Sequence, residues 1–260
     1  MKRLLYLAQP VRLGVVCSPG LKMKTALWAT IFTVLMAMGI GSARLYAAQE
    51  DGVALALIYD TSGSMREPVP DKSGQSTAKY VIANRALMAV AKQIQNFTTN
   101  TATGTPRKIH SGLFTFQGNQ VRETIKFGPF EAAALEDWAA HFSNPNGSTP
   151  LGNALAAASQ AVLKSPLSRK HVLVITDGIN TAGPDPARVL PRLKEQATQG
   201  RTILGVHFVA FDVDARVFDP VKKLGATVVA AADETQLNAQ LQFILQQKIL
   251  LEEEEPTKTK

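Results

Sequence analysis

The chain contains a short run of oxygen-bearing side chains with the spacing of a cation site. It reads Asp60-Thr61-Ser62-Gly63-Ser64, so a carboxylate and two hydroxyls alternate at every second position. A loop can turn all three side chains towards one point, and hard cations such as Mg²⁺ and Mn²⁺ prefer oxygen ligands. The same residues could form a plain turn in which Asp60 caps the next helix. The next predicted helix starts more than ten residues later, so we favour the cation site.

A second carboxylate is predicted at the same edge of the fold. Val53–Tyr59 and His171–Thr176 are continuous apolar runs, which are typical of strands buried on both faces. Asp60 follows the first run and Asp177 follows the second. Ligands of parallel α/β sheets bind beyond the carboxyl ends of the strands. The two aspartates are therefore candidates for one site on the pattern alone.

The remaining segments alternate between helical and strand patterns. Residues 77–97 carry apolar side chains at spacings of three and four, and residues 109–116 and 121–127 have the pattern of a β-hairpin. Asp185-Pro186 is a helix start, because aspartate caps helices and proline fits their first position. Further predicted elements are helices near 135–142, 151–162, 189–197 and 237–245 and strands at 202–211 and 227–231. This alternation predicts an α/β domain with a mostly parallel central sheet.

Two further segments complete a resemblance to a known family. Gly147-Ser148-Thr149-Pro150-Leu151-Gly152 lies directly before a predicted helix, and Thr176-Asp177-Gly178 ends a predicted strand. Together with the first motif, they resemble the von Willebrand factor A domain and its metal-ion-dependent adhesion site, over about residues 51–250. The resemblance implies a Rossmann-like, mostly parallel sheet with one antiparallel edge hairpin strand and helices on both faces.

The resemblance also implies a role for each motif residue. Ser62 and Ser64 would bind the metal directly, and Thr149 would do so in a ligand-competent state. Asp60 and Asp177 would act mainly through metal-bound water. Neutral hydroxyls leave the charge of Mg²⁺ (or Mn²⁺ or Ca²⁺) poorly neutralised, and Mg²⁺ keeps water at open positions. A partner protein could then supply an Asp or Glu carboxylate, which makes the expected function non-catalytic protein binding.

Two other classes of function remain as alternatives. Relatives in this family serve as regulatory or assembly subunits beside ATPases of the chelatase type, but these complexes are cytoplasmic. A hydrolase or phosphatase is disfavoured because the chain has no G-x-S-x-G elbow and no phosphate-binding loop. A phosphatase with an aspartyl nucleophile would want a second aspartate where Ser62 stands. The four histidines include no H-x-x-x-H pair.

The first 48 residues have the layout of an export signal. Basic Lys22 and Lys24 precede an uncharged stretch at 26–41 and a small-residue stretch at 43–48. We therefore expect a signal peptide at 23–48, with 1–22 as an upstream extension, and a periplasmic or secreted domain. The alternative is an uncleaved anchor in the inner membrane, with the domain facing the periplasm. Residues 251–260 are expected to form a charged flexible tail.

Charge and cysteine content narrow the partners further. The net charge is +7, but residues 1–47 hold six basic residues and no acid, so the remainder carries only +1. This balance argues against a nucleic-acid partner. A single cysteine, Cys17, excludes a disulfide framework and a cysteine-based zinc site. A glycan on Asn146, which lies in an N-x-[ST] pattern, would obstruct the proposed metal site, and this favours a bacterial periplasm.

Overall fold

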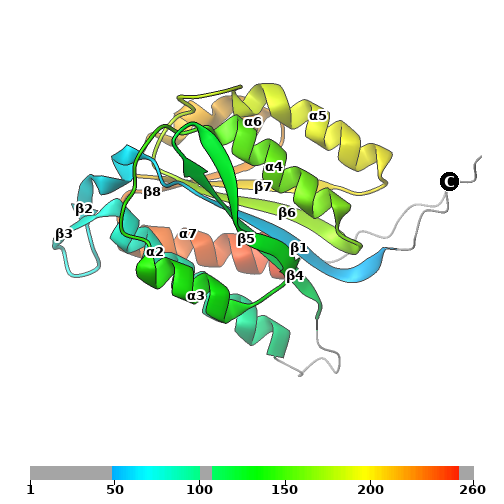
Figure 1. Cartoon of the computed structure of the whole chain (residues 1–260), viewed down its shortest axis with the longest axis horizontal. Coiled ribbons are helices and arrows are strands. Elements are labelled where there is room, and N and C mark those ends of the chain that lie inside the picture. Colours follow the sequence, from blue (N-terminus) through cyan, green and yellow to red (C-terminus); the bar gives the residue numbers. More distant parts are fainter. Residues whose placement is uncertain (1–48, 100–106, 252–260) are drawn as a thin grey trace, which may run out of the picture. The chain divides into compact units, whose positions relative to one another are not determined.

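The computed structural model describes residues 49–99 and 107–251, which belong to one unit of the chain. Its central sheet has six strands in the order β5-β4-β1-β6-β7-β8 (Figure 1). The strands are β1 (Glu50–Tyr59), β4 (Ile109–Gln117), β5 (Gln120–Pro129), β6 (Leu167–Thr176), β7 (Leu204–Phe211) and β8 (Thr227–Ala231). All neighbouring pairs are parallel except β4 and β5, which form the predicted hairpin. The predicted fold class is confirmed.

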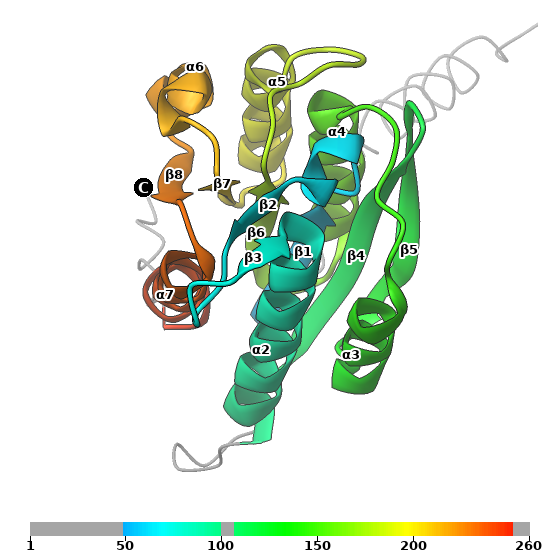
Figure 2. The same ribbon diagram turned by 90° about the vertical axis from the view of Figure 1, so that its left-hand side faces the viewer.

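Helices cover both faces of the sheet (Figures 1 and 2). One face carries α2 (Lys79–Thr99), α3 (Ala132–His141) and α7 (Glu234–Ile244), and α7 continues into one π-helical segment, η4 (Leu245–Leu250). The other face carries α4 (Leu151–Lys164), α5 (Pro186–Gln199) and α6 (Asp219–Lys223), which follows the 3₁₀ turn η3 (Ala215–Phe218). No helix among the described residues is long and apolar enough to cross a bilayer.

Strand β1 shows why the central strands are apolar along their whole length. Alternate side chains of a strand point to opposite faces, and here both faces lie under helices. Val53, Leu55 and Leu57 pack into the core below α2, α3 and α7. Ala54 and Ala56 pack into the core below α4 and α5. Every residue from Val53 to Tyr59 is buried, and the strand therefore holds a fixed position for the loop that follows it.

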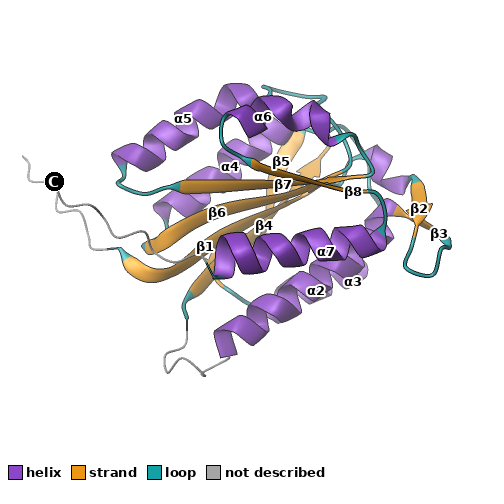
Figure 3. Ribbon diagram, turned by 180° about the vertical axis from the view of Figure 1, so that it is seen from behind, coloured by secondary structure: helices purple, strands orange, loops and turns teal. Residues whose placement is uncertain are grey.

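The segment after the first motif is more ordered than its proline and glycine content predicts. A 3₁₀ turn, η1 (Gly63–Arg66), is followed by a two-stranded sheet of β2 (Pro68–Pro70) and β3 (Ser76–Ala78) (Figure 3). The Asp71 carboxylate accepts hydrogen bonds from the backbone N–H groups of Ser73 and Gln75, which closes the turn between the strands. Because β3 runs to Ala78, helix α2 begins at Lys79 rather than at residue 77.

Residues outside the described part include several predicted features. The upstream extension, the export signal and nearly all of the charged tail fall there. These features stay predictions. The predicted start of α5 lies within the described part and is confirmed. Asp185 is the N-cap, its side chain accepts a hydrogen bond from the Ala187 N–H, and proline occupies the first turn.

Candidate metal site

The two predicted carboxylates lie together because β1 and β6 are neighbours that end at the same level. Tyr59 pairs with Ile175, and the Asp60 N–H donates to the Ile175 carbonyl at 3.0 Å. The chain leaves β1 towards β4 and leaves β6 towards β7, in opposite directions across the sheet. The loops after the two strands therefore diverge, and this is the position in an α/β sheet where a ligand-binding crevice is expected.

Asp60 follows the last residue of β1 and is fully buried. One carboxylate oxygen accepts a hydrogen bond from the Ser62 N–H at 2.8 Å, and the other accepts from the Thr176 hydroxyl at 2.5 Å. Burial raises the pKa of Asp60 to about 6, and the negative charge of Asp177 adds to the effect. A buried carboxylate whose hydrogen-bond donors are both neutral is favourably placed next to a cation.

A chain of hydrogen bonds links the two serines to the second aspartate. The hydroxyl oxygens of Ser62 and Ser64 are 3.0 Å apart, and the Ser64 hydroxyl donates to Asp177 Oδ1 at 2.9 Å. The 3₁₀ turn that starts at Gly63 brings Ser64 back beside Ser62. Burial raises the pKa of Asp177, although its hydrogen bonds with Lys79 and Ser64 oppose the increase. The first motif and Asp177 therefore form one connected group.

Thr149 reaches the same place from the loop before α4. A carbon atom added as Cβ on Gly178 would lie 3.8 Å from Ser64 Oγ and 3.9 Å from Thr149 Oγ1, so both hydroxyls approach a common point. The loop is fastened to the first motif by a hydrogen bond from the Gly63 N–H to the Gly147 carbonyl at 3.2 Å. The structure thus brings the predicted residues together, and the donors that they offer are hydroxyl and carboxylate oxygens.

A lysine that no sequence motif singles out lies beside the candidate site. Lys79 opens α2 and is only 2% exposed, and its ammonium group contacts three carboxylates. Nζ lies 3.0 Å from Asp177 Oδ2, 2.9 Å from Glu67 Oε2 and 3.2 Å from Asp212 Oδ2. Burial lowers the pKa of Lys79, but the hydrogen bonds with Glu67 and Asp177 outweigh it and raise the pKa above its ordinary value. Lys79 is therefore a permanent positive charge beside the site.

The partners of Lys79 come from distant parts of the chain. Glu67 follows η1, Asp177 follows β6 and Asp212 follows β7. Asp212 has a φ of +52°, a left-handed conformation that is uncommon for a residue other than glycine. A lysine at the start of a predicted helix has no local signal that would distinguish it from a solvated one, so only the fold reveals this cluster.

The donor set suits a hard divalent cation better than a softer metal. Among the described residues, no group of three or more His, Cys, Asp or Glu side chains could hold a metal ion. The candidate donors are the hydroxyls of Ser62, Ser64 and Thr149 and the carboxylates of Asp60 and Asp177. Oxygen-only sets of this kind match Mg²⁺, Mn²⁺ or Ca²⁺, whereas zinc and copper sites are dominated by nitrogen and sulfur.

Fold and site together define a doubly wound α/β domain with a cluster of side-chain oxygens at the switch point of its sheet. Residues 55–242 match the family of the von Willebrand factor type A domain. The chain therefore belongs to the von Willebrand factor type A domain family. No curated protein matches the chain with significant similarity.

Solved structures with the same fold share little sequence with the chain. The PilB minor pilin from Streptococcus sanguinis is 14% identical with a TM-score of 0.57, over 77% of this chain and 62% of the pilin. Proximal thread matrix protein 1 from the mussel byssus has a zinc-occupied metal-ion-dependent adhesion site (MIDAS) motif. It is 16% identical with a TM-score of 0.54, over 76% of this chain and 48% of the byssus protein.

The third structure is the vWF domain of the type V pili tip protein Mfa5 from Porphyromonas gingivalis. It is 12% identical with a TM-score of 0.54, over 77% of this chain and 95% of the domain. The chain thus spans less than two thirds of the pilin and of the byssus protein, and nearly all of the Mfa5 domain. At these identities the likeness establishes the fold alone.

Proposed function

We propose that this domain binds a partner protein through a divalent cation and catalyses no reaction. Ser62, Ser64 and Thr149 would bind the ion through their hydroxyls. Asp60 and Asp177 would act through metal-bound water. Mg²⁺ is the expected ion, with Mn²⁺ and Ca²⁺ as alternatives.

The observation that carries the proposal is the connected group of oxygens at the switch point. Ser62 and Ser64 are 3.0 Å apart, Ser64 bonds to Asp177 at 2.9 Å, and the Thr149 hydroxyl approaches the same point. Buried carboxylates are costly unless they pair with positive charge. Lys79 contacts Asp177, whereas the hydrogen-bond donors of Asp60 are the neutral Ser62 and Thr176. A cation in the crevice would supply charge that these neutral donors do not.

The partner should offer an Asp or Glu side chain to the ion. Three neutral hydroxyls cancel none of the charge of a divalent cation, and Mg²⁺ in proteins is usually bound through one or two carboxylates while it keeps several waters. Ile179, two residues after Asp177, is 55% exposed and could offer an apolar side chain to the partner. We place the encounter outside the cytoplasm, in the periplasm or at the cell surface. Support for this location comes from the export signal in the sequence and from the pilus proteins among the solved structures of the same fold.

Calorimetric titration with Mg²⁺, Mn²⁺ and Ca²⁺ tests the metal half of the proposal. Binding with a stoichiometry of one is expected for the purified chain, and Ser64→Ala should weaken it. Capture of proteins from a periplasmic extract, with and without chelator, tests the partner half. Capture that is lost on chelation and in Ser64→Ala supports the proposal. An absence of metal binding, even with captured partner present, would contradict it.

A further inference from the structure

The Lys79 ammonium and the Ser64 hydroxyl contact different oxygens of the Asp177 carboxylate. Asp177 Oδ2 is 3.0 Å from Lys79 Nζ, and Asp177 Oδ1 accepts the hydrogen bond from Ser64. When the Ser64 oxygen binds a metal, its hydrogen can still donate to Asp177. Both carboxylate oxygens of Asp177 are then engaged by other groups. Each oxygen keeps a second lone pair, but the two bonds together fix the orientation of the carboxylate, and a turn towards the ion would strain or break one of them.

The ammonium itself is held firmly in this position. Lys79 is 2% exposed, and its three carboxylate partners stand on three different segments of the chain. Its backbone is fixed as well, because the Lys79 N–H donates to the Glu67 carbonyl at 2.9 Å. Rotation of Lys79 away from Asp177 would remove a buried charge from its partners, which is strongly unfavourable. The tether on Asp177 is therefore a permanent feature of the fold.

From these contacts we infer that Lys79 is a positioning residue that prevents Asp177 from coordinating the ion directly. The inference rests on the proposed metal site. It deepens that proposal by explaining why the ion keeps an unmet demand for negative charge. In the wild type, the carboxylate that completes the coordination must come from the partner. A positive charge close to the ion strengthens the same dependence, because like charges repel at short range.

Removal of the tether should make the site self-sufficient. Without Lys79, the carboxylate of Asp177 can turn and replace one metal-bound water. Lys79→Met is expected to bind Mn²⁺ about 10-fold or more tightly, since a nearby positive charge is lost and a direct carboxylate ligand is gained. Water-proton relaxation of bound Mn²⁺ counts the waters that remain on the ion, and it should report one water fewer than in the wild type. Lys79→Arg keeps the charge and is expected to behave as the wild type does.

A double variant separates the tether from a general charge effect. If Asp177 is the new ligand, the gained affinity should largely disappear in the double variant D177N/K79M relative to D177N alone. Lys79→Gln serves as a second neutral variant, because it removes the charge and its shorter, polar side chain disturbs the group of carboxylates less than methionine does. Circular dichroism establishes that each variant is folded. If Lys79 had only a structural role, the variants that lack it would melt at a lower temperature and would not bind Mn²⁺ more tightly.

The outcomes distinguish this inference from the proposed function on which it rests. Tighter Mn²⁺ binding with one water fewer in Lys79→Met and Lys79→Gln supports the inference. The inference is overturned if the wild type binds Mn²⁺ and both variants bind it equally or more weakly, with the same number of bound waters. The metal site would then remain intact. If none of the proteins binds Mn²⁺, the metal site itself is wrong and the role of Lys79 falls with it.

Discussion

The hydroxyl of Thr61 makes two hydrogen bonds with the backbone of Phe116. Thr61 Oγ1 donates to the Phe116 carbonyl at 2.9 Å and accepts from the Phe116 N–H at 3.0 Å. The backbone pairing of β1 with β4 ends at Ile58 and Phe114, so this side chain extends the contact between the two segments beyond the last strand pair. The first-motif loop is thereby fastened to β4 on one side, while Asp60 fastens it to β6 on the other.

Replacement of Thr61 by valine should loosen this loop, although valine has nearly the same shape as threonine. Thr61 is buried, and the variant leaves two backbone groups of Phe116 without their partner, which costs about 1–3 kcal/mol. Thr61→Val is expected to lower the melting temperature and to weaken Mn²⁺ binding several-fold. Thr61→Ser keeps the hydroxyl and is the matched control. Identical melting and metal binding in valine and serine variants would show that the two hydrogen bonds are unimportant.

Removal of the charge of Asp60 should separate metal binding from stability. Losses of groups behind the direct ligands commonly cost about 10- to 100-fold in metal affinity, and we expect this range for Asp60→Ala. Asp60→Asn keeps the size and should lose similar affinity. The metal-free fold should survive both changes, because the apolar strands supply the core. Calorimetry on the three proteins measures the effect, and equal Mg²⁺ affinity in all of them would refute the role of Asp60.

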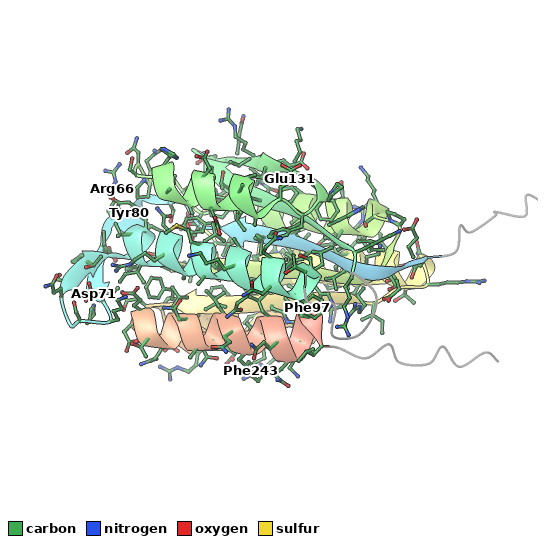
Figure 4. The ribbon with its side chains drawn as sticks, turned by 90° about the horizontal axis from the view of Figure 1, so that it is seen from below. Arg66, Asp71, Tyr80, Phe97, Glu131 and Phe243 are labelled. Carbon is green, nitrogen blue, oxygen red and sulfur yellow. The ribbon has the colours of Figure 1, made fainter. Side chains whose placement is uncertain are left out.

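The β2–β3 hairpin is predicted to border the partner-binding face. It begins directly after η1, and Asp71 lies at the same end of the α2 layer as Arg66 (Figure 4). The Lys72 N–H donates to the buried Glu234 at the start of α7, at 3.0 Å, and Glu234 also pairs with Arg85 at 3.0 Å. The hairpin is thus connected to the domain at its tip.

A shorter tip should affect partner binding more than stability. Replacement of Lys72-Ser73-Gly74 by a two-residue turn removes the Lys72 bond and the exposed bonds of Ser73 to Asp71, each worth about 1 kcal/mol or less, and leaves the Arg85 pair. We expect a small decrease in melting temperature and a clear change in the amount of partner captured from an extract. If neither the capture nor the melting temperature changes, the hairpin is an inert insertion.

Lys170 should make stability depend on pH in the alkaline range. Its side chain is 1% exposed, and burial lowers its pKa from 10.5 to about 8. The unfolded chain therefore binds more protons than the folded chain between pH 8 and 10.5, so stability rises with pH across that window. Below pH 8 the folded chain bears the full cost of the buried ammonium charge. Lys170→Met should stabilise the fold by on the order of 2 kcal/mol, after the loss of the bond to the Ser165 carbonyl is subtracted.

Denaturant unfolding at pH 7 and pH 11 measures this effect. Lys170→Met should be more stable than the wild type at pH 7, and the difference should shrink at pH 11. Lys164→Met, at an exposed position on α4, is the control and should show no such change. A stability difference that is the same at both pH values would indicate that the charge of Lys170 is not the cause.

The elements and the motif residues were accessible from the sequence because their signals are local. Continuous apolar runs predicted the buried strands β1 and β6, and the spacing of Ser62 and Ser64 is set within three residues. The position of Asp60 and Asp177 at strand ends followed from the same patterns. The hairpin of β2 and β3 was not predicted, because each strand is only three residues long and two of the three residues of β2 are prolines.

The sequence by itself determined the fold class and supplied the candidate oxygen donors of the proposed site. Only the tertiary structure decided how those donors are held. Lys79 meets carboxylates from residues 67, 177 and 212, and Thr61 meets Phe116, 55 positions further along the chain. A short pattern records which side chains a loop carries, whereas a contact between distant segments depends on strand order and register. The charge that tethers Asp177 is supplied by such a contact, and it exists only once β6, β7 and α2 have packed together.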